Sequence, residues 1–245
     1  MIESTSRKEF DMEYILETNN LGKKYGRFEV LKNLNMHIPK GSIYGLIGKN
    51  GAGKTTLIRV LCGLQKPTTG TYAIYGTLSK DKKISEERKR IGAIIESPSI
   101  CLDMTAEDNL KEQYKVVGLP NYDGLNELLK LVRLENTNKK IARKFSLGMR
   151  QRLGLAIALV GNPDLLILDE PVSGIDRNGI KEFYNIISKL KSEYDMSIIL
   201  VSHDLDLAKK YADKVILLDK EVIKEGRPEE VFRSLEFKNR FGELV

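Results

Sequence analysis

The feature that most constrains the fold is a glycine-rich segment between an expected strand and an expected helix. Residues 48–56 read GKNGAGKTT, which fits the pattern GxxxxGK followed by Ser or Thr. An apolar run at 43–47 precedes the segment and a helical pattern at 54–64 follows it. Glycines let successive backbone N–H groups point inward at a polyphosphate, and the helix N-terminus adds partial positive charge. The chain is therefore predicted to bind the phosphates of a nucleotide.

Two side chains of this loop carry specific chemistry. Lys54 is predicted to place its charge beside the β and γ phosphates, where it would also assist catalysis. The Thr55 hydroxyl can ligate Mg²⁺. The other loop residues predicted to contact the nucleotide are Gly48, Asn50, Gly51, Ala52, Gly53 and Thr56.

Two carboxylates follow an apolar strand later in the chain. The run at 165–168 ends in Asp169 and Glu170. In an open α/β sheet such residues emerge at the carboxyl edge, beside the bound nucleotide. We expect Asp169 to hold Mg²⁺ through a water molecule. Glu170 is expected to act as the general base that polarises the attacking water.

The order of elements indicates an α/β fold. Strand-like runs alternate with helical patterns, which predicts a mainly parallel sheet covered by helices on both faces. The expected strands are 43–47, 165–168, 198–201 and 215–218, and the expected helices are 54–64 and 180–194. Residues 97–160 have helical spacing, with Thr105 opening a capping-box pattern and Asp123 as an N-cap. The segment from Lys224 onward is charged and weakly patterned.

Composition limits the class of protein. The chain has 245 residues, and 41% of them are hydrophobic. Its net charge of +6 is only weak evidence for binding to nucleic acid, so no nucleic acid partner is expected. Its apolar runs fall short of the roughly 18 to 20 residues that a membrane-spanning helix needs. Residues 1–11 form a polar extension without the apolar core of a signal peptide, which favours the cytoplasm. Cys62 and Cys101 are interpreted as buried small hydrophobes.

A third motif brings a family resemblance. Residues 145–149 read FSLGM and open an apolar helix, which resembles the LSGGQ signature of ABC ATPases, with Leu147 and Met149 in place of Gly and Gln. In the same register, residues 173–176 (SGID) resemble the D-loop of that family. Tyr25 matches its adenine-stacking aromatic residue, and His203 its switch histidine. The resemblance extends from residue 14 to about residue 226.

The resemblance implies the ABC ATPase fold. That fold is a RecA-like P-loop NTPase core with an N-terminal antiparallel β part and a helical subdomain. The implied ATP-binding domain covers 12–245, with 12–95 and 161–223 as the α/β core, 97–160 as the helical signature subdomain and 224–245 as the C-terminal tail.

The resemblance also implies how ATP is bound and hydrolysed. Two ATPase subunits, in a homodimer or a heterodimer, would hold ATP between the phosphate loop of one and the signature helix of the other. Ser146 and Gly148 of the signature and Asp176 of the D-loop would contact the nucleotide. His203 would contact the γ-phosphate and position the water that Glu170 activates.

The resemblance to ABC ATPases also implies a membrane partner and a class of cargo. Glu96 stands where the family has the Q-loop glutamine, a magnesium ligand beside which the membrane permease docks, so we expect a metal ligand and a permease contact there. The chain would thus lie on the inner face of the membrane. Glu96 and the FSLGM signature resemble the ATPases of bacitracin and lantibiotic exporters, whose cargo is cationic peptides. The C-terminal part looks more like metal-ion importers, so the ATPase of a metal-ion or siderophore importer is the alternative, and a soluble non-transport ABC ATPase is a third.

Overall fold

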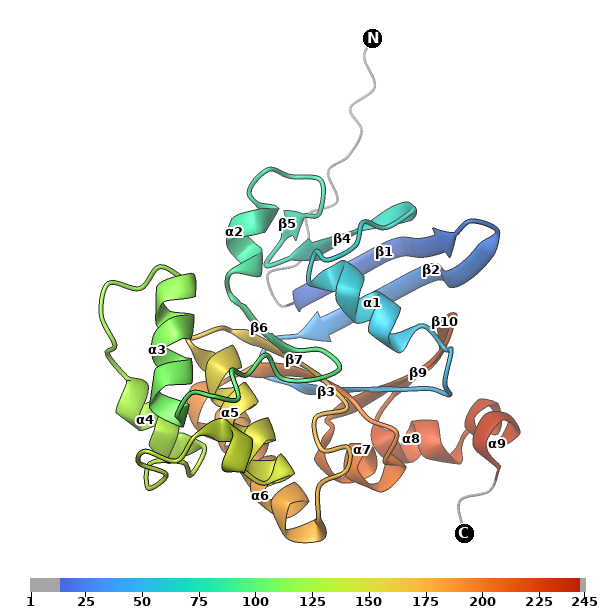
Figure 1. Cartoon of the computed structure of the whole chain (residues 1–245). Helices are drawn as coiled ribbons and strands as arrows, with labels where there is room; N and C mark the ends of the chain where they lie inside the picture. Colours follow the sequence, from blue (N-terminus) through green and yellow to red (C-terminus); the bar gives the residue numbers. More distant parts are fainter. Residues whose placement is uncertain (1–13, 243–245) are drawn as a thin grey trace.

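The computed structural model describes residues 14–242, which form two sheets with helices between and below them (Figure 1). The first sheet is antiparallel and has the strand order β2-β1-β4-β5. Its strands are β1 (Tyr14–Tyr25), β2 (Phe28–Pro39), β4 (Thr69–Ile74) and β5 (Thr77–Leu78). This sheet confirms the antiparallel β part that the family resemblance implied.

The second sheet is parallel except at one edge. Its order is β10-β9-β3-β8-β7-β6, and β10 alone among these described strands runs antiparallel to its neighbour. The strands are β3 (Ile43–Ile47), β6 (Ile91–Ile94), β7 (Leu165–Asp169), β8 (Ser197–Val201), β9 (Lys214–Asp219) and β10 (Glu221–Gly226). The four strands expected from the sequence all form, each within one residue of its expected ends.

Side chains of the central strands alternate between two cores. Leu165 and Ile167 of β7 belong to the core shared with the antiparallel sheet, whereas Leu166 and Leu168 belong to the core shared with the helices on the other face. This alternation follows from the two-residue period of a strand. Because both faces are covered, β3, β7 and β8 are buried along their whole length and mostly apolar, as buried parallel strands are.

One helix separates the two sheets. Helix α1 (Lys54–Leu61) follows the phosphate loop directly and packs Leu57, Ile58 and Leu61 into the core between the sheets (Figure 1). It ends three residues earlier than the expected 54–64, because Gly63 has a left-handed φ of 76° that ends the helix. The short helix α2 (Ile84–Arg88) packs against β4 and β5.

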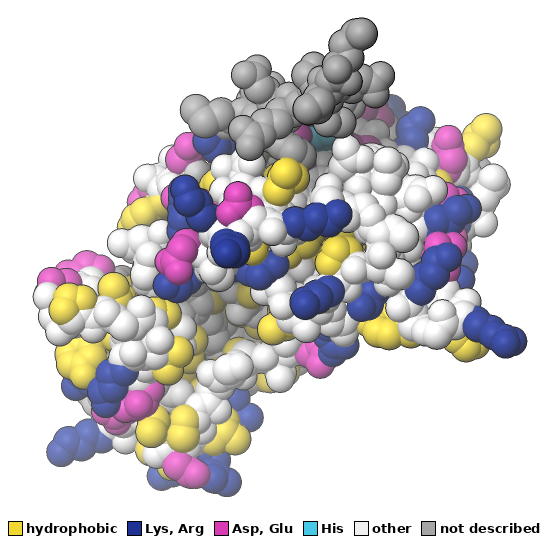
Figure 2. Space-filling model, turned by 90° about the horizontal axis from the view of Figure 1, so that it is seen from above, with side chains coloured by type: hydrophobic (Ala, Val, Ile, Leu, Met, Phe, Trp, Pro, Cys, Tyr) yellow, Lys and Arg dark blue, Asp and Glu magenta, His cyan; other side chains and the backbone are white. Residues whose placement is uncertain are grey.

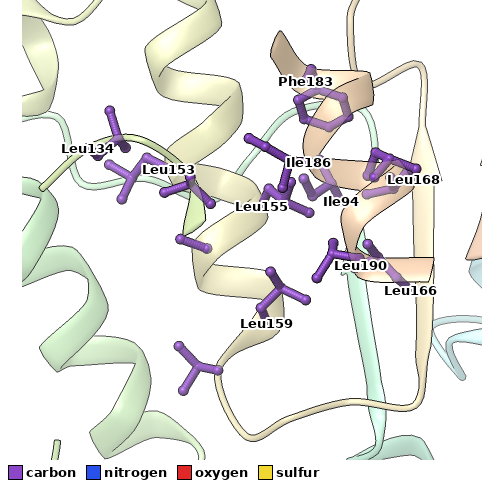
Figure 3. Close-up of a cluster of buried hydrophobic side chains, with 14 of the residues drawn as sticks. Ile94, Leu134, Leu153, Leu155, Leu159, Leu166, Leu168, Phe183, Ile186 and Leu190 are labelled. Atoms are coloured by element: carbon purple, nitrogen blue, oxygen red, sulfur yellow. The ribbon is translucent and has the colours of Figure 1, made fainter. Parts of the chain in front are cut away.

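The opposite face of the parallel sheet is covered by helices that also hold the helical subdomain in place. Figure 3 shows Leu155 and Leu159 of one helix pointing toward Ile186 and Leu190 of another, next to Leu166 and Leu168 of β7. The helices on this side are α3 (Ala106–Val116), α4 (Leu125–Leu131), the 3-10 turn η1 (Ala142–Lys144), α5 (Leu147–Leu159), α6 (Arg177–Tyr194) and α7 (Leu205–Tyr211). Helix α5 is apolar around most of its circumference because it lies between the helical subdomain and the sheet.

The two expected helix starts had different outcomes. Thr105 caps α3 and accepts a hydrogen bond from the Asp108 N–H at 3.1 Å, as predicted. The prediction that Asp123 caps α4 is wrong by one residue. Gly124 holds that position in a left-handed conformation with φ of 79°, while the Asp123 carbonyl accepts the Tyr114 hydroxyl at 2.6 Å.

The segment from Lys224 is more regular than its sequence pattern indicates. Strand β10 crosses the expected core boundary at 223, and helices α8 (Pro228–Arg233) and α9 (Leu235–Phe241) follow it. Phe232 and Phe237 of these helices pack beneath β3 and β9. The expected polar extension at 1–11 lies outside the described residues.

The surface and the two cysteines complete the description. Figure 2 shows Lys and Arg side chains spread over one face with Asp, Glu and hydrophobic side chains between them. Between residues 14 and 242, no helix combines the length and hydrophobicity needed to cross a bilayer. Cys62 is partly buried, and burial raises the pKa of its thiol to about 12. The prediction that Cys101 is buried is wrong, because it lies on an exposed loop before α3.

Candidate functional site

The phosphate loop is held by the strands around it. Gly48 lies so close to β9 that an added Cβ would stand 2.4 Å from the Leu218 carbonyl oxygen, so a larger residue cannot replace it without movement. Gly51 and Gly53 have φ values of 81° and 98°, a region that favours glycine. The Lys220 N–H donates to the Ala52 carbonyl at 2.9 Å. The loop is therefore shaped by its own glycines and by the turn after β9.

Lys54 is folded back into this loop. Its Nζ donates to the Gly48 carbonyl at 2.7 Å and to the Lys49 carbonyl at 3.2 Å, and the residue is only 7% exposed. Burial lowers the pKa of Lys54, while the nearby Glu170 and Asp169 carboxylates oppose that effect. The ammonium group is thus held by backbone carbonyls of the phosphate loop.

The Thr55 hydroxyl and the end of β7 meet at the edge of the loop. Thr55 Oγ1 donates to Asp169 Oδ2 at 3.0 Å, and Asp169 is 4% exposed. Burial raises the pKa of Asp169, and the hydrogen bond from Thr55 and the charge of Lys54 oppose the rise. A hydroxyl and a carboxylate at this separation are oxygen ligands of the kind that Mg²⁺ prefers.

Glu170 turns away from the line of β7. Its φ of 51° is left-handed, a strained conformation for glutamate that its N–H stabilises by donating to the Val201 carbonyl at 3.1 Å. The turn brings its carboxylate to the segment after β8. There the His203 N–H donates to Glu170 Oε2 at 3.1 Å, and His203 Nε2 lies 3.1 Å from Oε1.

The Glu170 carboxylate has the environment of a base. Burial raises the pKa of Glu170, and the His203 N–H and the Lys54 charge oppose the rise. Although Oε1 is close to the His203 ring, the approach lacks hydrogen-bond geometry, and this buried oxygen accepts no hydrogen bond within the described part of the chain. One carboxylate oxygen is therefore fixed by the backbone while the other is left to accept a proton.

These groups share one pocket of about 400 Å³. Eleven of its lining residues were predicted from the sequence, namely Asn50, Gly51, Ala52, Gly53, Lys54, Thr55, Thr56, Glu96, Asp169, Glu170 and His203. Val30 and Ser173 also line it and were missed. Ser173 belongs to the SGID motif, so the motif itself was the available signal, whereas Val30 is an ordinary strand valine.

Tyr25 lies outside that lining. It ends β1, is 43% exposed, and its hydroxyl hydrogen-bonds to the Gln65 side chain. Lys23 Nζ lies over its ring, 5.1 Å from the centroid. An exposed ring is available for stacking, and the adenine contact stays a prediction.

Glu96 follows β6 and reaches the pocket from the opposite side. It has a left-handed φ of 64°, and its carboxylate hydrogen-bonds to the Arg59 guanidinium of α1. Sequence reasoning missed Arg59, although its position four residues after Thr55 places both on one face of the helix. Glu96 is close enough for its charge to raise the pKa of Asp169.

The signature residues line a different pocket, of about 380 Å³. Ser146 caps α5 by accepting from the Met149 N–H at 3.2 Å, and Asp176 caps α6 by accepting from the Gly179 N–H at 2.7 Å. Gly148 packs against Ile175, since an added Cβ would lie 3.4 Å from the Ile175 Cγ2. Among the described residues, none that lines this pocket also lines the first one. Apart from Tyr25 and Gly48, which line neither pocket, the fold thus separates the predicted site residues into two groups.

The donor set suits a magnesium ion held mainly by a nucleotide. Across residues 14–242 no cluster of three His, Cys, Asp or Glu side chains could hold a metal alone. Thr55 and Asp169 instead offer two oxygens next to the phosphate loop. Mg²⁺ in nucleotide sites is typically bound by one or two protein ligands together with phosphates and waters, so the residues fit it.

Comparisons with known proteins agree with this geometry. A family model described as ABC transporter matches residues 31–173. The chain is 42% identical over 230 residues to the bacitracin transport ATP-binding protein BcrA of Bacillus licheniformis, covering 94% of this chain and 74% of that protein. It is 40% identical over 227 residues to the lantibiotic transport ATP-binding protein SrtF of Streptococcus pyogenes, covering 90% of this chain and 96% of that one.

A solved structure gives the same result for the fold. A dimeric bacterial ABC transporter cassette superposes with a TM-score of 0.76 at 27% identity, over 87% of this chain and 98% of that one. The phosphate loop, the paired carboxylates and the signature helix thus occur in one fold that this family shares. The chain belongs to the ABC transporter family, as one of the ATP-binding subunits that hydrolyse ATP.

Proposed function

We propose that this chain powers a separate membrane permease that exports peptide antibiotics, and that it hydrolyses ATP at an interface between two ATPase subunits. The observation that carries the proposal is the division of the site residues into two pockets, one built for phosphate chemistry and one built around the Ser146 helix start. Neither pocket holds both sets of groups. A second subunit would supply the missing set.

The first pocket supplies the groups for phosphate binding and hydrolysis. Lys54 would exchange its two loop carbonyls for phosphate oxygens, because a charged acceptor forms the stronger hydrogen bond. Glu170 would accept the proton of the attacking water, and its raised pKa improves it as a base near neutral pH. His203 would orient the water and the γ-phosphate from the other side of that carboxylate.

Thr55 and Asp169 would hold Mg²⁺, with Glu96 as a third oxygen donor. When bound, the ion neutralises charge that develops on the phosphates during transfer. The buried position of Asp169 keeps its oxygens fixed beside Thr55, so this chain contributes the orientation of the site.

The second pocket would close over the γ-phosphate held by the partner. Ser146, Gly148 and the first N–H groups of α5 form an anion-binding helix start, and Asp176 fixes the neighbouring start of α6. The phosphate would then hold the two subunits together, and hydrolysis would release them. The dimeric relative supports this arrangement.

The cargo is proposed from the named relatives. Both relatives described above carry names of peptide-antibiotic transport, at identities of 42% and 40%, and this favours peptide antibiotics over the metal-ion or siderophore alternative. The permease would dock near Glu96, on the inner face of the membrane.

The cargo is tested in vesicles that contain the chain together with its permease. Bacitracin or a lantibiotic should raise the rate of ATP hydrolysis and accumulate across the membrane, whereas a ferric siderophore should do neither. Stimulation by the siderophore with no response to either peptide would contradict the cargo assignment while leaving the ATPase assignment intact.

A further inference from the structure

The ion pair between Arg59 and Glu96 stands between two pockets. Glu96 lines the nucleotide pocket, and together with Arg59 it lines a neighbouring pocket of about 350 Å³ that extends to Pro98 and Gly154. Glu96 is the residue that the two linings have in common. Its carboxylate is therefore within reach of two different environments.

One face of α1 holds two carboxylates. Thr55 donates to Asp169, and Arg59, one helical turn later, donates from Nη2 to Glu96 Oε1. Asp169 is buried, whereas the side chain of Glu96 is 62% exposed. Helix α1 thus hydrogen-bonds to Asp169 in the interior of the protein and to Glu96 at the exposed edge of the pocket.

The charges of the pocket explain why Glu96 needs a partner. Three carboxylates, Glu96, Asp169 and Glu170, line the pocket that receives a polyanionic nucleotide. Lys54 is the lysine of the loop that lines this pocket, and Arg59 offsets the charge of Glu96. Without Arg59, Glu96 would repel incoming phosphates, and it would also be free to attract a cation.

The pair is weak enough to exchange. The Arg59 side chain is 37% exposed and that of Glu96 is 62% exposed, and ion pairs with such access to water contribute little stability. A divalent ion beside Thr55 and Asp169 offers Glu96 a stronger electrostatic partner than an exposed guanidinium does. A glutamine at position 96 would carry no charge, so neither the Arg59 guanidinium nor the divalent ion would form an ion pair with it.

We propose that Arg59 is a positioning residue that competes with the divalent cation for the carboxylate of Glu96. The proposal rests on the proposed function, in which the cation binds at Thr55 and Asp169. In the metal-free state Arg59 holds Glu96 and lowers the negative potential of the pocket. In the metal-loaded state Glu96 leaves Arg59, so the segment after β6 responds directly to the arrival of the metal.

The test measures two affinities whose changes have opposite signs. Mn²⁺ binding is followed by electron paramagnetic resonance in the presence of a non-hydrolysable ATP analogue, and analogue binding is followed separately in EDTA. Arg59→Ala should tighten Mn²⁺ binding by about two- to five-fold, the range expected when an exposed ion pair no longer competes. In EDTA it should weaken analogue binding. General damage to α1 would weaken both.

Two further variants assign the effect to Glu96. In a Glu96→Gln background, Arg59→Ala should leave Mn²⁺ affinity unchanged, because the competition is already gone. Arg59→Lys keeps the charge and should stay near the native values. Equal effects of Arg59→Ala in both backgrounds, or weaker Mn²⁺ binding in the native background, would overturn the inference. Absence of nucleotide-dependent Mn²⁺ binding to the native protein would instead refute the proposed metal site.

Discussion

The two pockets of this chain differ in how completely a single copy builds them. In the phosphate pocket Lys54 is 7% exposed and Asp169 is 4% exposed, and each is already held by hydrogen bonds within the chain. In the signature pocket Ser146 is exposed and Leu147 beside it is 43% exposed. Groups that are already ordered lose little conformational entropy when a ligand binds, which lowers the free-energy cost of binding. One copy therefore already holds the nucleotide-facing groups in place, whereas the signature surface is proposed to be completed by a partner.

Glu170→Gln should have the largest effect, and it separates chemistry from assembly. Loss of the base should lower the rate of ATP hydrolysis by about a thousand-fold, the scale of general-base catalysis, while ATP still binds. Steady-state hydrolysis and nucleotide binding measure the two separately. Asp164→Asn, at a surface ion pair with Arg90, is the matched control and should hydrolyse ATP normally.

Lys54→Ala tests the preorganised pocket directly. Removing the buried ammonium should weaken ATP binding by about 100-fold, the usual scale for losing one partner of a buried charged hydrogen bond. Lys49→Ala changes the adjacent loop lysine, whose ammonium lies 6.0 Å from the centre of the Phe241 ring, and it should bind ATP normally. Native affinity in Lys54→Ala, measured with a fluorescent nucleotide, would remove the basis for the phosphate pocket.

Ser146→Asp tests the incomplete pocket. Aspartate still caps a helix, so α5 should stay folded, but its charge would repel the γ-phosphate of the partner's nucleotide. Hydrolysis should fall by at least about tenfold, while a single copy binds ATP as before. Ser234→Asp places the same change at the capping serine of α9 and should leave hydrolysis unaltered. If both variants hydrolyse ATP at the native rate, Ser146 is only a cap.

The smallest expected effect is on the pH profile of the phosphate pocket. Glu170 must be ionised to accept a proton, and burial raises its pKa. Activity should therefore decline, as the pH falls, at a higher pH than an ordinary glutamate would cause. The profile of kcat/KM measures this in the free enzyme. An acid limb at the ordinary pH of a glutamate would show that this burial has no catalytic consequence.

Much of the phosphate pocket could be predicted because its chemistry is local in sequence. The loop at 48–56 and the carboxylates after β7 are each encoded in a few consecutive residues next to an apolar strand. The strand boundaries were equally accessible, since buried parallel strands are continuous apolar runs.

Other features depend on packing that a local pattern does not carry. Helices α8 and α9 are six and seven residues long, too short to show a clear period, and they are held by the aromatic contact of Phe232 with Phe237. Cys101 is exposed because it lies on a surface loop, although cysteine is among the residue types most often buried. The pairing of Arg59 with Glu96 joins segments 37 residues apart, and only the folded chain brings them together.

The central claim is that the two pockets cooperate across two copies, and mixing two impaired variants tests it most directly. Lys54→Ala retains an intact signature surface, and Ser146→Asp retains an intact phosphate pocket. An equal mixture should recover roughly a quarter of the native rate of ATP hydrolysis, since half of the randomly formed dimers are mixed and each contains one complete site. A mixture no more active than the sum of its separate components would contradict the account.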